Sequence, residues 1–142
     1  MEWSLTKYEE FIYSIANEFS FVERSNLIVK RRGKDWAELT GRVYFENDYS
    51  LEVREIVDFS SENFIRRYGY AVRKGDEILY WYDSQEHPDD PNLQITHPHN
   101  KHIHPNIKHN RIPAPLMSFS RPNLLVIIQE IEDLIKGLEK MK

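Results

Sequence analysis

All six histidines of this 142-residue chain lie within 23 residues, from His87 to His109, and the other 119 residues contain none. The window contains two pairs, His97-Pro98-His99 and His102-Ile103-His104. Side chains two residues apart in an extended chain point to the same side. The imidazoles of each pair could therefore converge on one object, either a metal ion or a phosphate group.

Metal-free cleavage of RNA is one chemistry that this window could perform. Attack by the 2′-hydroxyl of RNA on the neighbouring phosphorus needs a base, an acid and positive charge near the phosphate. Histidine suits both proton transfers, and lysine or arginine supplies the charge. We predict that His99 and His102 exchange the proton and that Lys101 stabilises the phosphate. Asp83 is expected to orient an imidazole, and His87 is a supporting candidate.

Basic and aromatic residues on either side of the window are candidates for binding such a substrate. Tyrosine rings could stack on unpaired bases, although alternation along a strand turns only one face outward. The predicted substrate-binding residues are Arg66, Tyr68, Tyr80, Tyr82 and Arg111.

A metal site is the second chemistry that the spacing allows. Its candidate ligands are His97, His99, His102 and His104, which would suit zinc or another divalent transition metal. No His-Glu-x-x-His helix is present, and the absence of cysteine removes thiolate ligands. The metal-free reading needs no cofactor. A third interpretation is purely structural, with the histidines bonded to the loop backbone.

Composition limits the class of protein. The chain is 40% apolar and 30% charged, with a net charge of −4, which argues against coating nucleic acid over the whole surface. Charge is segregated, because Arg66-Arg67 is basic whereas 46–62 carries six acids and one arginine. No window is long and apolar enough for a membrane span, and residues 1–10 do not resemble a signal peptide. We therefore expect a cytoplasmic protein.

Periodicity predicts the elements that position these residues. Apolar residues from Tyr8 to Phe19 recur at helical spacing, with Thr6 as N-cap and Glu9 completing a capping box. Apolar residues from Leu124 to Leu138 predict a second helix, with Ser120 as cap and Pro122 in the first turn.

Between these helices the period shortens to that of strands. Asn47-Asp48 and Lys74-Gly75-Asp76 indicate hairpin turns, and a phase change at Ile56 predicts a bulge near Arg54–Glu55. Five strands of an antiparallel meander are predicted: 27–32, 36–46, 49–59, 64–74 and 77–83.

The segment 84–119 holds six of the seven prolines and all six histidines. Its recurring apolar residues favour an ordered loop over disorder. The expected architecture is a single α+β domain over residues 1–142, in two layers: helix, five-stranded meander, long loop, helix. An exposed edge such as 27–32 could pair two chains into a homodimer. A non-catalytic module that docks a protein through the loop and the acidic stretch is the alternative function.

Three short segments resemble the TumE-type family, whose members are assigned as toxins of prokaryotic toxin–antitoxin pairs. These segments are Arg66-Arg67-Tyr68-Gly69-Tyr70, the stretch 79–83 (LYWYD) with His87-Pro88, and Thr96-His97-Pro98-His99-Asn100-Lys101-His102. The likeness covers about half of the chain. It implies a toxin that cleaves RNA or blocks translation, with an antitoxin protein as partner.

The chain departs from the family pattern at two positions. Asn100 stands where the pattern has a second histidine, and Trp81 stands where it has an arginine. If that arginine binds phosphate, then Lys101, Arg66 or Arg111 must replace it here.

Overall fold

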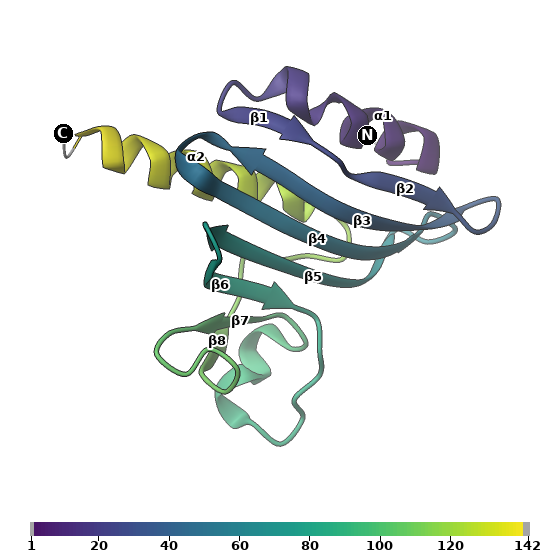
Figure 1. The fold of residues 1–142 in the computed structure, drawn as a ribbon. Coiled ribbons are helices and arrows are strands. Elements are labelled where there is room, and N and C mark those ends of the chain that lie inside the picture. Colours follow the sequence, from purple (N-terminus) through teal and green to yellow (C-terminus); the bar gives the residue numbers. More distant parts are fainter. Residues whose placement is uncertain (1, 141–142) are drawn as a thin grey trace.

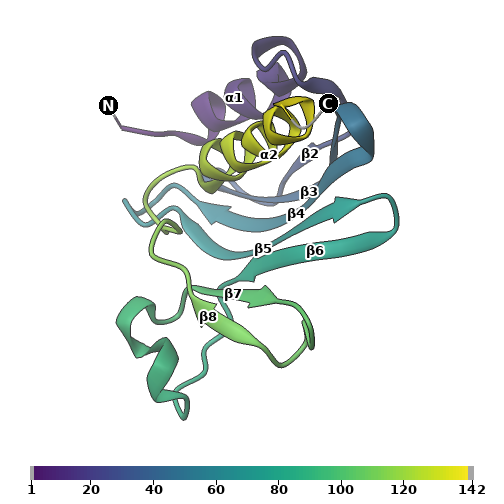
Figure 2. The same ribbon diagram turned by 90° about the vertical axis from the view of Figure 1, so that its left-hand side faces the viewer.

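The computed structural model describes the backbone of residues 2–140 and the side chains of residues 2–137. Within that range an eight-stranded antiparallel sheet is covered on one face by α1 (Leu5–Glu18) and α2 (Asn123–Lys140), which lie side by side (Figures 1 and 2). The predicted α+β class and its helix, sheet, helix order in two layers are therefore confirmed. We call the face under the helices the helix face, and the other the open face.

Four long strands form the centre of the sheet. They are β3 (Trp36–Phe45), β4 (Tyr49–Asp58), β5 (Ile65–Lys74) and β6 (Glu77–Asp83). Two short strands, β1 (Val22–Ser25) and β2 (Ile28–Arg31), both pair with β3. The predicted turns are confirmed. Asn47 and Asp48, in the 3-10 turn η1 (Glu46–Asp48), have φ of 61° and 66°, and Gly75 has φ of 57°. Asparagine, aspartate and glycine tolerate this left-handed region best.

The count of five strands was too low, chiefly because the histidine-rich segment contributes two more. In this segment β7 (Asn100–Ile103) pairs with β6, and β8 (Arg111–Pro113) pairs with β7. A short 3-10 helix, η2 (Pro91–Thr96), precedes them and buries Leu93, so the prediction of an ordered segment is confirmed. Strands of three or four residues are too short to show a period, and only their pairing partners specify them.

The predicted bulge near Arg54–Glu55 was wrong. The β3–β4 register continues through Thr40↔Arg54 and Leu39↔Glu55 without a break. The β4 strand keeps its phase by turning Glu55 into the core and Ile56 outward. An irregularity does occur nearby, in the β4–β5 pairing, where Ile56 and Val57 face residues 67 and 65.

Both predicted helix starts were also wrong by a few residues. The N-cap of α1 is Ser4, whose hydroxyl accepts a hydrogen bond from the Lys7 amide at 3.2 Å, rather than Thr6. The α2 helix begins at Asn123, directly after Pro122, so Ser120 lies outside it.

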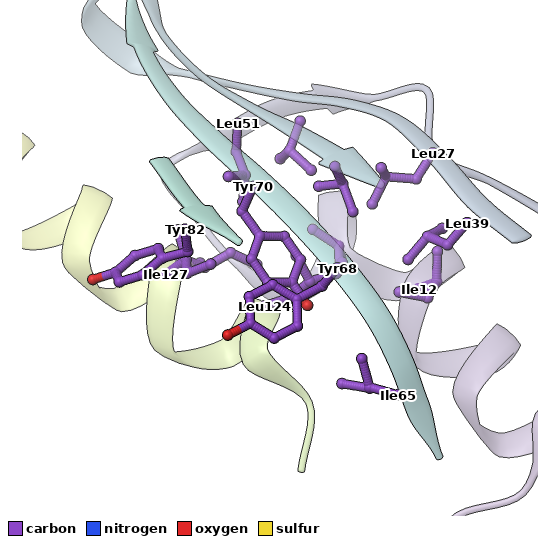
Figure 3. Packing of buried hydrophobic residues seen from close by; sticks show 14 of the residues in the cluster. Ile12, Leu27, Leu39, Leu51, Ile65, Tyr68, Tyr70, Tyr82, Leu124 and Ile127 are labelled. Carbon is purple, nitrogen blue, oxygen red and sulfur yellow. The ribbon is translucent and has the colours of Figure 1, made fainter. Parts of the chain in front are cut away.

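The helices bury their apolar stripes against the sheet, as the periodicity indicated. Figure 3 shows Leu124 and Ile127 of α2 beside the tyrosines of β5 and β6. The buried helical residues are Leu5, Tyr8, Ile12, Ile15, Asn123, Leu124, Ile127, Ile128, Ile131 and Ile135. No helix in the described part of the chain is long and apolar enough to cross a membrane.

The edge strand β2 is partly occupied by α1. The hydroxyl of Tyr13 accepts a hydrogen bond from the Val29 amide at 2.9 Å, and Arg31 pairs with Glu9. These contacts use groups that edge pairing between two chains would need. A homodimer through this edge stays a prediction.

Candidate functional site

The strand β7 separates residues that the sequence places together. Asn100 pairs across the sheet with Asp83, and His102 pairs with Trp81, so these four side chains lie on the open face. Lys101, between them, points to the helix face, because successive strand residues alternate. The structure therefore brings His102 to Asp83 but directs Lys101 away from both.

His102 and Asp83 form a buried pair between β7 and β6. The Nε2 atom of His102 lies 3.0 Å from Oδ2 of Asp83, and Nδ1 lies 2.8 Å from the Ile107 carbonyl oxygen. The ring is only 5% exposed and stacks on Trp81, with centroids 4.1 Å apart. Burial raises the pKa of Asp83, but hydrogen bonds from His102 and Trp81 outweigh it and hold that pKa below its usual value.

This geometry indicates a structural role for His102, which we call its holding role: it links β7 to β6. Both ring nitrogens lie within hydrogen-bond distance of protein oxygens, one of Asp83 and one of the Ile107 backbone. The pair fixes β7 against β6 and thereby positions the residues on either side of it.

Replacing His102 with alanine should lower the free energy of unfolding by about 2–4 kcal/mol, because it leaves a cavity beside Trp81 and removes one of the three hydrogen bonds that the part-buried Asp83 carboxylate accepts. Chemical denaturation measures this effect. The matched control is His104→Ala. The His104 side chain is half exposed, and its Nε2 lies 2.7 Å from the Ile78 carbonyl oxygen and 3.8 Å from Oε1 of the exposed Glu77. The control should cost less than about 1 kcal/mol. Equal losses in both variants would refute the holding role.

His99 lies just before β7, between two aromatic rings. Its Nδ1 atom is 2.6 Å from the hydroxyl oxygen of Tyr68, and its ring lies 4.6 Å from that of Phe119. Burial, with a further contribution from nearby His97, lowers the pKa of His99 below its ordinary value. Burial and the charge of Asp83 raise the pKa of Tyr68, which keeps it a neutral phenol.

The imidazole of His99 is therefore neutral at neutral pH and held at one nitrogen. In the tautomer whose proton is on Nδ1, that N–H donates a hydrogen bond to the Tyr68 hydroxyl oxygen, and Nε2 carries the lone pair that can accept a proton. Within residues 2–137 that nitrogen makes no hydrogen bond, which is the arrangement that a general base requires.

A third cluster joins His87 to Arg111 on the open face. Arg111 lies opposite His102 in the β7–β8 pairing. Burial, and to a lesser extent the charge of Arg111, lowers the pKa of His87. Nε2 of His87 and Nε of Arg111 are both buried and lack a hydrogen-bond partner in the described part of the chain. Asn100, where the family pattern has histidine, donates to the carbonyl oxygens of Gln85 and Pro98, so it serves the loop backbone.

Two of the predicted substrate-binding tyrosines pack against α2. The hydroxyls of Tyr80 and Tyr82 donate to Glu130 at 3.0 and 2.8 Å. The ammonium of Lys101 lies 4.2 Å from the centre of the Tyr80 ring and 5.3 Å from that of Tyr82. The positive charge of Lys101 therefore lies on the helix face, beside Tyr80 and Tyr82.

The four histidines proposed as alternative metal ligands have different partners. His99 contacts Tyr68, His102 contacts Asp83, His104 contacts a backbone carbonyl, and His97 is exposed. Among the residues that the structure describes, no three histidine or carboxylate side chains are grouped as metal ligands.

A groove of about 1640 Å³ crosses the open face. Its lining includes Asp83, Pro98, which precedes His99, and Tyr68 and Phe119, whose rings contact that of His99; the His99 side chain itself is not part of the lining. Exposed basic side chains line the same groove: Arg54, Arg66 and Arg67. None of these three has a carboxylate within 4.0 Å among the described residues.

Three residues of these clusters were not predicted from the sequence. Phe119 contacts His99, and Glu130 accepts hydrogen bonds from Tyr80 and Tyr82. Both lie far from these partners in sequence, so no local pattern predicts the contacts. Glu55 is a third: it lies in the core, 3% exposed, and accepts hydrogen bonds from Tyr8 and Tyr70. A carboxylate at an inward position of an otherwise regular strand was its only signal.

Comparison with known proteins gives one match. A family model described as "Toxin TumE" matches residues 12–135, which is most of the chain. No curated protein and no solved structure matches it.

Proposed function

The chain belongs to the TumE toxin family, and from that premise we propose that this toxin cleaves RNA without a metal ion. Membership of a family of toxins from toxin–antitoxin systems implies an antitoxin as partner. We propose the cytoplasm as the place where both proteins act.

The arrangement of His99 carries this proposal. It is the predicted catalytic histidine whose Nδ1 is held by Tyr68 while Nε2 stays free, and its pKa is lowered so that the ring is neutral. Three arginines of the nearby groove, Arg54, Arg66 and Arg67, pair with no carboxylate within the described residues, whereas a fourth, Arg42, pairs with Glu52. A neutral base next to such a groove suits a polyanionic substrate.

The proposed reaction is transfer within the RNA itself. Nε2 of His99 takes the proton of a 2′-hydroxyl, the 2′-oxygen attacks the adjacent phosphorus, and the bond from phosphorus to the 5′-oxygen breaks. The products are a 2′,3′-cyclic phosphate and a 5′-hydroxyl, whose proton comes from an acid or water.

Other residues have supporting roles in this proposal. Arg66, and from the other side Arg111, stabilise charge on the phosphate, because Lys101 lies on the helix face. Tyr68 orients His99, and the pair of Asp83 and His102 holds the strands from which His99 emerges. His87 lies beside Arg111, and its Nε2 is buried without a hydrogen-bond partner in the described part of the chain, which makes it a supporting residue rather than a direct phosphate ligand.

The purified protein should degrade unstructured RNA equally well with and without a strong chelator such as EDTA. The proposed transfer uses only side chains and the 2′-hydroxyl, so removing divalent ions takes away nothing that it needs. Gel analysis of end-labelled RNA, with a 2′-deoxy substrate as the control that must stay intact, measures the reaction. Loss of cleavage on chelation and recovery with zinc would contradict the proposal and support the histidine metal site. Growth arrest with RNA left intact would favour a translation block.

A further inference from the structure

We infer that the open face of the sheet binds single-stranded RNA across Gly69, with its phosphates on Arg54 and Arg67. This inference deepens the proposed function and rests on it for the choice of RNA as ligand. It adds a binding track on the central strands β4 and β5.

Gly69 is the first observation. It lies within the ten-residue strand β5, where glycine weakens a strand unless something approaches closely. A Cβ atom added there would meet no atom within 4 Å, and its φ is an ordinary one for a strand. Gly41 differs, because its φ of 136° and a contact of 2.8 Å to the backbone of Asn26 require glycine. The fold itself does not demand glycine at position 69.

The register places Gly69 at the bottom of the groove. Arg54 of β4 lies directly across from it on one side, and Asp83 of β6 on the other. All three line the groove of the open face. The missing side chain therefore leaves a depression between Arg54 on one side and the Asp83–His102 pair on the other.

The charge around the depression is the second observation. Arg31, Arg32, Arg42 and Arg73 each pair with a glutamate within 4.0 Å, and one of these pairs, Arg42 with Glu52, lines the same groove. Arg54 and Arg67 are exposed and have no such partner among residues 2–137. A guanidinium that is free of carboxylates on a concave surface suits a phosphodiester group.

Asp83 determines on which side of Gly69 the phosphates of a bound RNA strand lie. Its Oδ2 accepts hydrogen bonds from His102 and Trp81, its Oδ1 accepts from the Gln85 amide, and its pKa stays low. The ionised carboxylate repels phosphate. The phosphates of a bound strand are therefore expected on the arginine side of Gly69, and the sugars and bases over the glycine.

Binding of a short, unstructured RNA by fluorescence anisotropy tests this track. The full chain carries His99→Ala in every sample, so that the RNA stays intact. Gly69→Val should weaken binding about tenfold or more, because the side chain fills the depression. Its melting temperature should stay equal or rise, since valine favours strands. The matched control is Ala71→Val, a change at the next outward position of β5, outside the groove lining, which should bind normally.

Two variants of surface arginines test the track independently, even if Gly69→Val does not fold. Arg54→Ala and Arg67→Ala should each reduce the slope of log affinity against log salt by about 0.7 in magnitude, the value for one phosphate contact with a single strand. Arg31→Ala is the control that should leave the slope unchanged.

The outcomes separate this inference from the proposed reaction. Cleavage of RNA by wild type, together with normal binding by the Gly69 and arginine variants, overturns the track alone. Binding along the track by a wild-type protein that leaves RNA uncut overturns the reaction alone. No binding of RNA by any sample overturns the track.

Discussion

Replacing His99 with alanine should lower the rate of RNA cleavage by about two to four orders of magnitude, the usual worth of one positioned acid–base group. His99→Gln should lose as much, although its amide can still bond to Tyr68, because it cannot take up the substrate proton. Single-turnover cleavage of end-labelled RNA measures both rates. Since the ring is only half-buried, both variants should remain folded, as checked by circular dichroism.

The control for this result is His104→Ala, which changes an exposed histidine of the same segment and should retain the wild-type rate. Retention of more than about a tenth of the wild-type rate in His99→Gln would remove His99 from the role of base. In that case His87, whose Nε2 also lacks a partner within the described residues, is the next histidine to test.

The dependence of the cleavage rate on pH distinguishes a catalytic from a structural role of His99, because a purely structural residue would not produce the pH profile of a base. A base must be unprotonated, so the rate should fall as the pH drops through the lowered pKa of His99. Part of that lowering comes from His97. His97→Ala should therefore shift this fall to higher pH without abolishing cleavage.

Replacing Glu55 with glutamine should remove most of a pH dependence of stability that the wild-type protein shows between about pH 4.5 and 7. Glu55 accepts hydrogen bonds from Tyr8 and Tyr70, and Asn123 donates to Tyr70 at 3.1 Å. Burial raises the pKa of Glu55 to about 7 from its usual 4.5, although the two tyrosine hydrogen bonds act in the opposite direction.

The sign follows from proton linkage. Between the two pKa values the folded protein holds a proton on Glu55 that the unfolded chain has lost, so the free energy of unfolding falls as the pH rises. The contribution is complete below about pH 4.5 and is lost through pH 7, for a total of about 3 kcal/mol. Glutamine stays neutral, so Glu55→Gln should match wild type near pH 4.5 and exceed it at pH 8.

Urea denaturation at several pH values measures this effect. Glu52→Gln is the matched control on the same strand, because Glu52 lies on the open face and pairs with Arg42 and Arg73. The control should keep the pH dependence of wild type. Parallel pH profiles for Glu55→Gln and wild type would show that Glu55 is ionised in the core. Glu55→Ala, which leaves the tyrosine hydroxyls unpartnered, should lose about 3 kcal/mol or more at every pH.

Local patterns were enough to predict the frame of the protein. The helical stripe that begins at Leu124 and the hairpin turns at Asn47-Asp48 and Gly75 needed only residues that are neighbours in sequence. The errors occurred where a distant partner decides. Glu55 breaks the apolar alternation because Tyr8 of α1 and Tyr70 of β5 satisfy it, and β7 is a strand only because β6 offers it an edge.

The sequence by itself determined the α+β class, the order of the elements and the concentration of imidazoles in one segment, because periodicity and turn chemistry act over a few residues. Only the tertiary structure decided what each imidazole can do. Strand pairing brought His102 into contact with Asp83 and directed Lys101 toward α2. Tyr68, from a separate segment, contacts Nδ1 of His99, while Nε2 has no hydrogen-bond partner within residues 2–137. The reactivity of a side chain depends on its neighbours in space, and those neighbours come from parts of the chain that sequence spacing does not relate.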